Sequence, residues 1–212
     1  MILWNVSRPE LGLPGIARWL RAQDADIIAL PEGYRIGSTS AAQWRREMPG
    51  YEIVELPADM LCLVRGTIAP QEPHPLPTDL NYALLRAEIR GRAVTLLQID
   101  ISASVFKSRR RALAELTALA HEHRHENLIV LGDFNTPRES VWLDPLRAEM
   151  AHAFEAAGRG TAETWPLPSP VLALDQIWTG PGLRTLHCIH GFSLRSDHRA
   201  VIADFAFAPA QD

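Results

Sequence analysis

Acidic and amide side chains recur at the ends of the strands that the sequence predicts. The clearest case is LIVLGDFN, residues 128–135, in which four aliphatic residues lead through Gly132 to Asp133 and Asn135. The residues placed at or near such strand ends are Asn5, Glu32, Asp100, Asp133, Asn135, Asp175, Asp197 and His198. Carboxylate oxygens are the ligands that hard cations such as Mg²⁺ prefer. If these side chains converge on one cleft, they would form a site for cation-assisted chemistry.

Each of these residues taken singly has a simpler explanation, because Asp, Asn and Gly commonly end strands through turn chemistry. Their repetition at most of the predicted strand ends favours a shared cleft instead. Gly132 is expected to let the backbone turn tightly. Asp133 and Asn135 are two residues apart, so an extended backbone would point both into the cleft and Phe134 into the interior.

The elements that position these residues are strands interspersed with helices. Helices are expected at residues 13–25, at 38–48 with Ser and Thr caps, and at 107–125, with helical turns broken near Pro145 in 140–158. A Pro-rich exposed loop is expected at residues 69–77. Strands are expected at residues 2–6, 26–30, 51–56, 60–65, 82–89, 93–102, 127–131, 174–178, 183–189 and 200–207. This pattern predicts one α/β domain over residues 1–212, with mixed sheets.

Five motifs carry a resemblance to a known superfamily. They are WNV (4–6), DIIALPEG (26–33), LIVLGDFN (128–135), LDQIW (174–178) and SDHRAVIADF (196–205). In order and spacing they resemble the endonuclease/exonuclease/phosphatase superfamily of deoxyribonuclease I-like metal-dependent phosphoesterases, and TWP at 164–166 resembles its bacterial branch. The resemblance covers nearly the whole chain and implies a four-layer α/β/β/α sandwich of two packed mixed sheets flanked by helices.

The same resemblance implies a metal site. Glu32 would be the main ligand, assisted by Asn5 and Asp197. The implied cofactor is Mg²⁺, with Mn²⁺ as a substitute. One or two ions would both be compatible with the sequence.

The resemblance also implies the catalytic roles. Asp133 would align the attacking water and help to deprotonate it, and Asn135 would hold a non-bridging phosphate oxygen. His198 would hydrogen-bond the scissile phosphate, and Asp175 would orient that imidazole. These residue types suit the reaction, because a cation and an imidazolium offset the charge of a phosphodiester in the transition state. An Asp partner would also raise the pKa of His198.

Two positions depart from the pattern. Where nuclease members have His or Tyr, Asp100 stands here in LQIDIS, and we count it among the catalytic candidates. An aspartate cannot stabilise a phosphate as an imidazolium does, so Asp100 leaves the substrate class open. Gln176 stands where many members have His, and it is expected to be a packing or hydrogen-bonding change.

Other polar and aromatic groups allow two interpretations each. In KSRRR (107–111), Arg109 and Arg111 would contact substrate phosphates or lie on a solvated helix face. Trp142 and Trp165 would stack on a base or, as the preferred interpretation, pack in the core. The histidines of HEHRH (121–125) fit a solvated helix end better than a metal site, and Arg65 is not expected at the site.

The composition limits the classes of function. The chain has 212 residues, 47% hydrophobic and 22% charged, with a net charge of −4. Such a charge gives no whole-protein attraction for a polyanion, so nucleic-acid binding would need a local basic patch. Cys62 and Cys188 are expected to be buried thiols, which fits a reducing, cytoplasmic compartment. No window resembles a membrane helix or leader, although the first strand begins so early that a preceding membrane or secretory segment is an alternative.

The leading functional prediction is a Mg²⁺-dependent phosphodiester hydrolase, and in particular a nuclease acting on nucleic acid. The alternatives are a phosphoesterase acting on a phospholipid headgroup or a small phosphorylated metabolite, and a catalytically dead binding module. The acidic balance and the short chain slightly favour a lipid or metabolite substrate over nucleic acid, and the retained cluster of acids argues against a dead site. Substrate identity, endo or exo action and oligomeric state are open from the sequence.

Overall fold

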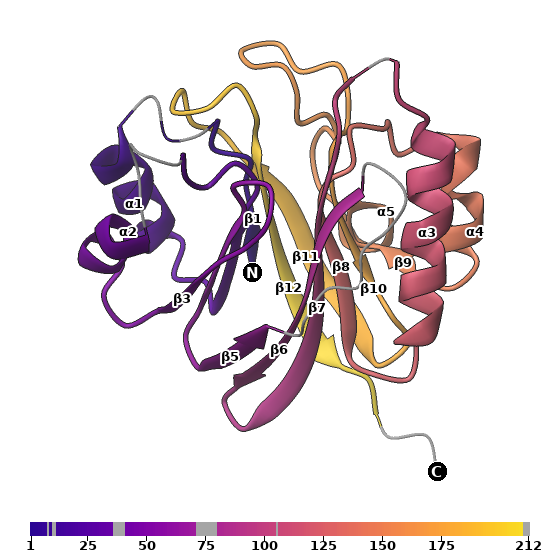
Figure 1. The fold of residues 1–212 in the computed structure, drawn as a ribbon, viewed down its shortest axis with the longest axis horizontal. Coiled ribbons are helices and arrows are strands. Elements are labelled where there is room, and N and C mark those ends of the chain that lie inside the picture. Colours follow the sequence, from indigo (N-terminus) through magenta and orange to yellow (C-terminus); the bar gives the residue numbers. More distant parts are fainter. Residues whose placement is uncertain (8, 10–11, 36–40, 71–79, 105, 210–212) are drawn as a thin grey trace.

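The computed structural model describes residues 1–7, 9, 12–35, 41–70, 80–104 and 106–209. Over these residues two mixed sheets of six strands each pack face to face, with helices on both outer faces (Figure 1). Helices α1 and α2 cover the first sheet, and α3 and α4 cover the second. The predicted four-layer α/β/β/α sandwich is confirmed.

The first sheet contains both ends of the described chain. Its strands, in spatial order, are β11 (Leu183–Gly191), β12 (Ala200–Phe207), β1 (Ile2–Leu3), β2 (Ile27–Leu30), β4 (Leu61–Val64) and β3 (Glu52–Glu55). Strands β1 and β2 are parallel, and their neighbours are antiparallel. Every residue of β1, β2 and β4 is buried, as expected for strands covered on both faces.

The second sheet holds the central part of the chain. Its strands, in spatial order, are β5 (Thr67–Pro70), β6 (Leu80–Ile89), β7 (Arg92–Ile101), β8 (Leu128–Asp133), β10 (Asp175–Thr179) and β9 (Ala151–His152). Strands β7 and β8 are parallel, whereas β8 and β10 are antiparallel. The register places Asp100, Asp133 and Asp175 side by side across β7, β8 and β10.

The helices lie on the outside of the sheets or at their edge. They are α1 (Leu13–Ala22), α2 (Ala41–Glu47), α3 (Arg109–Glu122), the 3₁₀ turn η1 (Val141–Leu143), α4 (Asp144–Arg147) and α5 (Ala153–Ala157). In α1, Pro14 lies in the first turn, and Ile16, Ala17 and Leu20 form the buried face. None of the described helices is both long and apolar enough to cross a membrane.

Three hydrophobic clusters fill the spaces between the layers. The inter-sheet cluster includes Leu3, Ala29, Leu131 and Ile177, and the other two lie beneath α1–α2 and beneath α3. Along β8 the side chains alternate, so Ile129 and Leu131 face the other sheet and Leu128 and Val130 face α3. The same alternation places Asp133 on the inter-sheet side.

The approach of β7 to β8 explains Gly132. Its φ is +152°, and a Cβ built there would lie 1.9 Å from the carbonyl oxygen of Ile99. No other residue type fits this approach without moving β7. Gly132 is a residue of strand β8 that allows β7 to approach closely, whereas the sequence predicted a tight turn at this position.

The structure corrects several predicted boundaries. The first two residues of the predicted Pro-rich loop, Ala69 and Pro70, are the end of strand β5. This strand lies at the edge of its sheet, where the missing N–H of a proline does no harm. Residues 71–77 of the predicted loop, and the predicted caps at 38–40, lie outside the described residues. Pro145 lies in the first turn of α4 and does not break a helix, and β9 follows where helical turns were predicted. Helix α3 ends at Glu122, so His125 is not on it.

The two cysteines are free and buried, as predicted. Burial raises the pKa of each thiol to about 12, so neither is reactive as a thiolate near neutral pH.

Candidate active site

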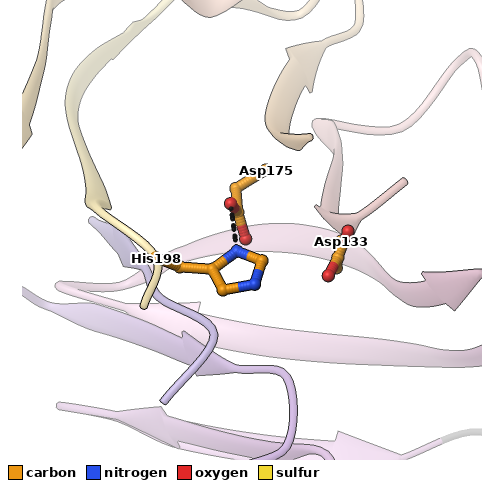
Figure 2. Close-up of side chains that lie close together, drawn as sticks. All are labelled: Asp133, Asp175 and His198. Carbon is orange, nitrogen blue, oxygen red and sulfur yellow. Dashed lines mark hydrogen bonds and ion pairs between the residues drawn. The ribbon is translucent and has the colours of Figure 1, made fainter. Parts of the chain in front are cut away.

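A buried Asp–His pair joins the two sheets at one end of the sandwich. Asp175 is the first residue of β10 in the second sheet, and His198 precedes β12 in the first. The Asp175 Oδ2 lies 2.8 Å from Nδ1 of His198, with both residues buried (Figure 2). This contact fixes the imidazole so that its second nitrogen, Nε2, faces away from Asp175, on the side of Asp133 (Figure 2).

Asp133 is the third buried member of this group. It pairs in register with Asp175, and its Oδ1 accepts a hydrogen bond from the Asn135 backbone N–H at 2.9 Å. Burial, followed by the charge of Asp175, raises the pKa of Asp133 to about 7, although His198, Asn135 and Asn5 act in the opposite direction. Asp133 can therefore take up or release a proton near neutral pH.

His198 is shifted toward its charged form. Burial alone would lower its pKa, but the surrounding carboxylates, Asp175 foremost, raise the pKa of His198 to about 9. The imidazole is consequently a cation at neutral pH, with Nδ1–H donated to Asp175 and Nε2–H directed to the other side. The sequence predicted an Asp partner that raises the pKa of His198, and Asp175 has that position here.

Asn5 and Glu32 extend the site on the side of the first sheet. The Asn5 Nδ2 lies 3.2 Å from Oε1 of Glu32 and 3.2 Å from Oδ2 of Asp133, so one amide joins two carboxylates. The Asn5 Oδ1 accepts from the Ser7 backbone N–H at 3.0 Å. The nitrogen of the Asn5 amide therefore faces the carboxylates. The predicted role as a metal ligand would use the amide oxygen, which faces Ser7 instead.

Asp197 is held by two donors on neighbouring loops. Its Oδ1 accepts from the Ser7 hydroxyl at 2.5 Å, and its Oδ2 accepts from Nε1 of Trp165 at 3.0 Å. Although partial burial opposes them, these hydrogen bonds and the charge of His198 lower the pKa of Asp197. The carboxylate is thus ionised and fixed in place next to the Asp–His pair.

Sequence reasoning missed the side chains that fasten these loops together. The Ser196 hydroxyl donates to the Asn5 carbonyl at 2.7 Å and accepts from the His198 N–H at 3.0 Å. The Trp4 indole donates to the His198 carbonyl at 2.9 Å. The SDH motif contains Ser196, but its partner Asn5, which follows β1, is 191 residues away and no local pattern points to it.

Asn135 does not have the extended backbone that the sequence suggested. Its φ is +45°, in the left-handed region that Asn tolerates better than most residues. Its Nδ2 donates to the Ile101 carbonyl at 2.8 Å, which ties the loop after β8 to the end of β7. The second hydrogen of that amide is the one available to a ligand. Phe134 is fully buried beneath α3, as predicted.

The two arginines predicted to bind substrate differ in their surroundings. Arg109 donates to three backbone carbonyls, those of Asn135 at 2.6 Å, Ala103 at 2.9 Å and Ser104 at 3.3 Å. It therefore fastens the loop that carries Asn135. Arg111 is exposed on α3. Asp100 is half-buried and lies in register with Asp133, which places it at the same end of the second sheet.

Trp142 and Trp165 do not pack in the core. Trp142 is 46% exposed on η1, and Trp165 is half-buried, with its ring centroid 6.3 Å from that of His198. The preferred core assignment was wrong for Trp142, and Trp165 belongs to the site. Ser140 caps η1, as expected near this position.

Other polar residues lie where the sequence suggested. His121 pairs with Glu149 and His123 with Glu126 near the end of α3, away from the site. Gln176 is buried and donates to the Thr136 carbonyl at 2.7 Å, a hydrogen-bonding role. Arg65 pairs with Asp24 beside the start of β2, whereas Glu32 follows the end of that strand.

Asp133, Asp175 and His198 also satisfy the spacing of a metal site. One ligand atom from each lies within 4.8 Å of the others, so this buried group could hold a metal ion. Glu32 provides a further carboxylate, joined to the group through Asn5.

The two packed mixed sheets and this cluster at their end define a phosphoesterase-type sandwich. Residues 2–198 match the model of the Endonuclease/Exonuclease/phosphatase family. The chain belongs to this family, whose members hydrolyse phosphoester bonds. No curated protein matches the sequence.

Solved structures with the same fold share little sequence with the chain. An endonuclease/exonuclease/phosphatase family protein from Bacteroides thetaiotaomicron has a TM-score of 0.74 at 14% identity, covering 98% of this chain and 97% of that one. TDP2 of D. rerio, complexed with a single-strand DNA product, has a TM-score of 0.74 at 16% identity, covering 97% of both chains. A mannosyl-6-phosphatase from Bacteroides thetaiotaomicron has a TM-score of 0.70 at 14% identity, covering 97% and 98%. These similarities establish the fold.

Proposed function

We propose that the protein is a Mg²⁺-dependent phosphodiester hydrolase that acts on nucleic acid. The observation that carries the proposal is the buried arrangement of Asp133, Asp175 and His198 beside Asn5 and Glu32. It combines a carboxylate with a pKa of about 7 and an imidazole with a pKa of about 9. Two titratable groups with pKa values pushed apart by their surroundings are the usual basis for separate base and acid roles.

The roles of the residues follow from these protonation states. Asp133, when ionised, accepts a hydrogen bond from the attacking water and takes its proton. His198 donates from Nε2 to an oxygen of the phosphate, while Asp175 holds the orientation of the ring through Nδ1 and stabilises its charge. Asn135 donates its free amide hydrogen to a non-bridging oxygen without adding negative charge.

The donor set near Glu32 fits a hard cation. Two carboxylates, Glu32 and Asp133, converge on the single amide of Asn5, and a cation beside them would offset their charge. Glu32 would be the principal ligand. Asp197 would assist, and Asn5 would do so through Oδ1 only after its amide turned from Ser7. Bound Mg²⁺ supplies positive charge that stabilises the phosphate in the transition state.

A cation held by Asp133, Asp175 and His198 fits this electrostatic arrangement less well. Nδ1 of His198 is engaged with Asp175, and a protonated Nε2 has no lone pair for a metal. We therefore assign this group to proton transfer and phosphate contact. Mn²⁺ would replace Mg²⁺ at the Glu32 side, because it also favours oxygen ligands.

Exposed aromatic side chains on the segments that follow β7 and β8 support a nucleic-acid substrate. Trp142 on η1 follows the loop of Asn135, and Phe106, in the loop between β7 and α3, is 97% exposed. Exposed aromatic rings and nearby basic residues such as Lys107 and Arg111 are the features that bind single strands, through stacking and phosphate contacts. TDP2 of D. rerio, solved with single-strand DNA, has the same fold.

A second candidate is hydrolysis of a small phosphorylated metabolite. Asp100 in register with Asp133 adds negative charge at this end of the sheet, which disfavours a polyanion. Arg109 is engaged with backbone carbonyls, which reduces the basic groups available to a strand. A mannosyl-6-phosphatase shares the fold.

A substrate panel tests the proposal directly. The protein is incubated with Mg²⁺ and single-stranded DNA, plasmid, RNA, bis(p-nitrophenyl) phosphate, mannose 6-phosphate or sphingomyelin, with a chelator in parallel. Chelator-sensitive cleavage of nucleic acid supports the proposal. Turnover of the sugar phosphate or the lipid alone would reject the nuclease and favour the second class. Activity that persists in the chelator would reject the metal requirement.

A further inference from the structure

Only one oxygen of the Asp175 carboxylate is used in the contact with His198. Oδ2 receives the Nδ1–H of His198 at 2.8 Å. Oδ1 is fully buried and has no hydrogen-bond partner within the described parts of the chain. A buried carboxylate oxygen without a donor is destabilising, so a partner is expected at Oδ1.

Asp175 lines an enclosed cavity together with His152 and His190. The centre of a water-sized sphere can occupy about 10 Å³ of this space, and Ile177 and Val201 form part of its apolar wall. That volume corresponds to about one water molecule. His152 precedes α5 and His190 is near the end of β11, so three separate elements bring polar side chains to one small space.

The two histidines present complementary groups. Nδ1 of His152 accepts from the Glu155 N–H at 3.2 Å, so the neutral ring carries its hydrogen on Nε2. The His190 ring makes a hydrogen bond with the Thr161 backbone that raises its pKa, as a bond to a carbonyl does. That bond leaves Nδ1 of His190 as an acceptor.

Both rings are neutral in this environment, and both facing atoms lack a partner. Burial first, then the nearby arginines Arg138 and Arg147, lower the pKa of His152 to about 3, and burial lowers that of His190 to about 4. Nε2 of His152 and Nδ1 of His190 are buried without a hydrogen-bond partner in the described structure. The cavity is therefore lined by residues that carry one unused donor and two unused acceptors.

We propose that one ordered water fills this cavity and makes His152 and His190 positioning residues for the Asp175–His198 pair. The water donates to Oδ1 of Asp175 and to Nδ1 of His190, and it accepts from the Nε2–H of His152. A water molecule has two hydrogens to donate and oxygen lone pairs to accept, which matches this set. The catalytic consequence rests on the proposed function, whereas the water site itself does not.

The consequence for the site is a carboxylate held at both oxygens. With Oδ1 bound to the water and Oδ2 to His198, Asp175 cannot rotate away from the imidazole. The orientation of His198 Nε2 then depends on two histidines that do not touch the substrate. Partners of this kind fix the geometry of the groups that they support.

Three variants test the proposal. His190→Phe keeps a ring stacked on Phe154 but removes the acceptor. His190→Gln restores a polar partner, and Val201→Ala alters the apolar wall of the same cavity as a packing control. Each is assayed on the diester cleaved by the wild type, with Tm measured in parallel. We expect His190→Phe to lower kcat about 10-fold with KM nearly unchanged, His190→Gln to recover most of the loss, and Val201→Ala to retain kcat.

A second measurement does not depend on activity. The Nδ1 proton of His198, bonded to Asp175, is followed by proton NMR, and a high-resolution crystal structure is examined for the water. The resonance should broaden or shift in His190→Phe and stay in place in Val201→Ala, even if no substrate is found.

Two outcomes of the activity-independent measurement would overturn the proposal. One is an empty cavity in the crystal structure, and the other is a His198 resonance that His190→Phe leaves unchanged. Equal loss of kcat in His190→Phe and Val201→Ala, in proportion to Tm, would likewise reduce His190 to a packing residue. Lack of activity in the wild type on every substrate would count against the proposed function alone.

Discussion

Oδ2 of Asp175 lies 2.8 Å from Nδ1 of His198, and this contact links one sheet of the sandwich to the other at the site. Asp175 comes from the start of β10 and His198 from the segment before β12. The reactive end of the imidazole is therefore positioned by both sheets, and any relative movement of the layers would displace it. The site is formed where the two halves of the fold meet.

The Asp175–His198 contact predicts a shift in the pH dependence of activity. Asp133 must lose its proton and His198 must keep its own, so kcat/KM should rise through about pH 7 and fall through about pH 9. Asp175 raises both pKa values, so Asp175→Asn should move both limbs to lower pH, by about 1 unit or more. It should also lower kcat about 1000-fold, because the ring loses the partner that orients it and stabilises its charge. Profiles of kcat/KM measured from acid to alkaline pH check this; limbs that do not move would contradict the assignment.

The folded-state pKa of His198 has a consequence for stability as well. Because that pKa is raised above the unfolded value of 6.5, the stabilisation from the ion pair is fully present below pH 6.5. It is lost as the pH rises from 6.5 through about 9. Asp175→Asn should show a smaller loss of stability across this range in urea unfolding.

Glu32 is expected to be required for the effect of Mg²⁺ on activity and on Tm. Glu32→Gln keeps the shape of the side chain and an oxygen near Asn5 but removes the charge that a cation requires. We expect Mg²⁺-stimulated turnover to fall at least about 100-fold. The rise in Tm on adding Mg²⁺ should also disappear, because only binding to the folded state stabilises it. Glu122→Gln on exposed α3 is the matched control. Wild-type activity in Glu32→Gln would place the cation elsewhere.

Gly132 is expected to be the least replaceable glycine near the site. A Cβ would lie 1.9 Å from the Ile99 carbonyl oxygen, so Gly132→Ala must push β7 and β8 apart. We expect a loss of about 3 kcal/mol in the free energy of unfolding.

Gly91 is the control. It lies in the turn between β6 and β7 and has φ +75°, but no atom lies within 4 Å of a built Cβ. Gly91→Ala should cost only about 1 kcal/mol. Chemical denaturation of both variants makes the comparison, and equal losses would mean that close strand approach is not the cause.

The sequence allowed the site to be predicted where its signal is local. A buried aliphatic strand ending in Gly132-Asp133 and a later Asp197-His198 before another strand mark the same end of a sandwich. Alternation along β8 then places Asp133 between the sheets and Phe134 beneath α3. The alternation follows from the period of a strand, whereas the convergence of Asp133 with Asp197 and His198 was implied by the resemblance to the family.

The parts that could not be predicted depend on contacts between distant segments. The bond from Trp165 to Asp197 and the bond from Ser7 to the same carboxylate join loops that no spacing rule relates. Asn135 was expected to be extended, but the bond to the Ile101 carbonyl holds it at φ +45°. Arg109 was expected to contact substrate phosphates or to lie on a solvated helix face, but it donates to loop carbonyls such as that of Asn135. Tertiary hydrogen bonds decided each of these cases.

Phe106 and Trp142 are expected to bind nucleobases if the substrate is a single strand. Both rings are exposed on the segments that follow β7 and β8, and stacking of a base on such a ring is worth about 1–3 kcal/mol. Phe106→Ala and Trp142→Ala should therefore raise KM for single-stranded DNA about 10-fold, with kcat retained. Leu186→Ala, on an exposed position of β11, is the control. The same KM for bis(p-nitrophenyl) phosphate in all variants would show that the rings act on bases, whereas unchanged KM for DNA would argue for a smaller substrate.

Asp100 is expected to restrict the substrates that the site accepts. It lies in register with Asp133 at the same end of the second sheet, so its charge opposes the approach of a strand with several phosphates. Asp100→His replaces that charge by a group that donates to phosphate. We expect kcat/KM for single-stranded DNA to rise about 5-fold, as expected for a change of about 1 kcal/mol in a charge interaction near the surface. Turnover of bis(p-nitrophenyl) phosphate, which carries one phosphate, should change less.

Asp100→Asn separates the loss of the carboxylate from the gain of the imidazole, and circular dichroism of both variants tests their folding. If both variants fold and neither alters the ratio of DNA to small-diester turnover, Asp100 does not determine specificity, and the preference for one substrate class must come from the aromatic and basic groups on the loops.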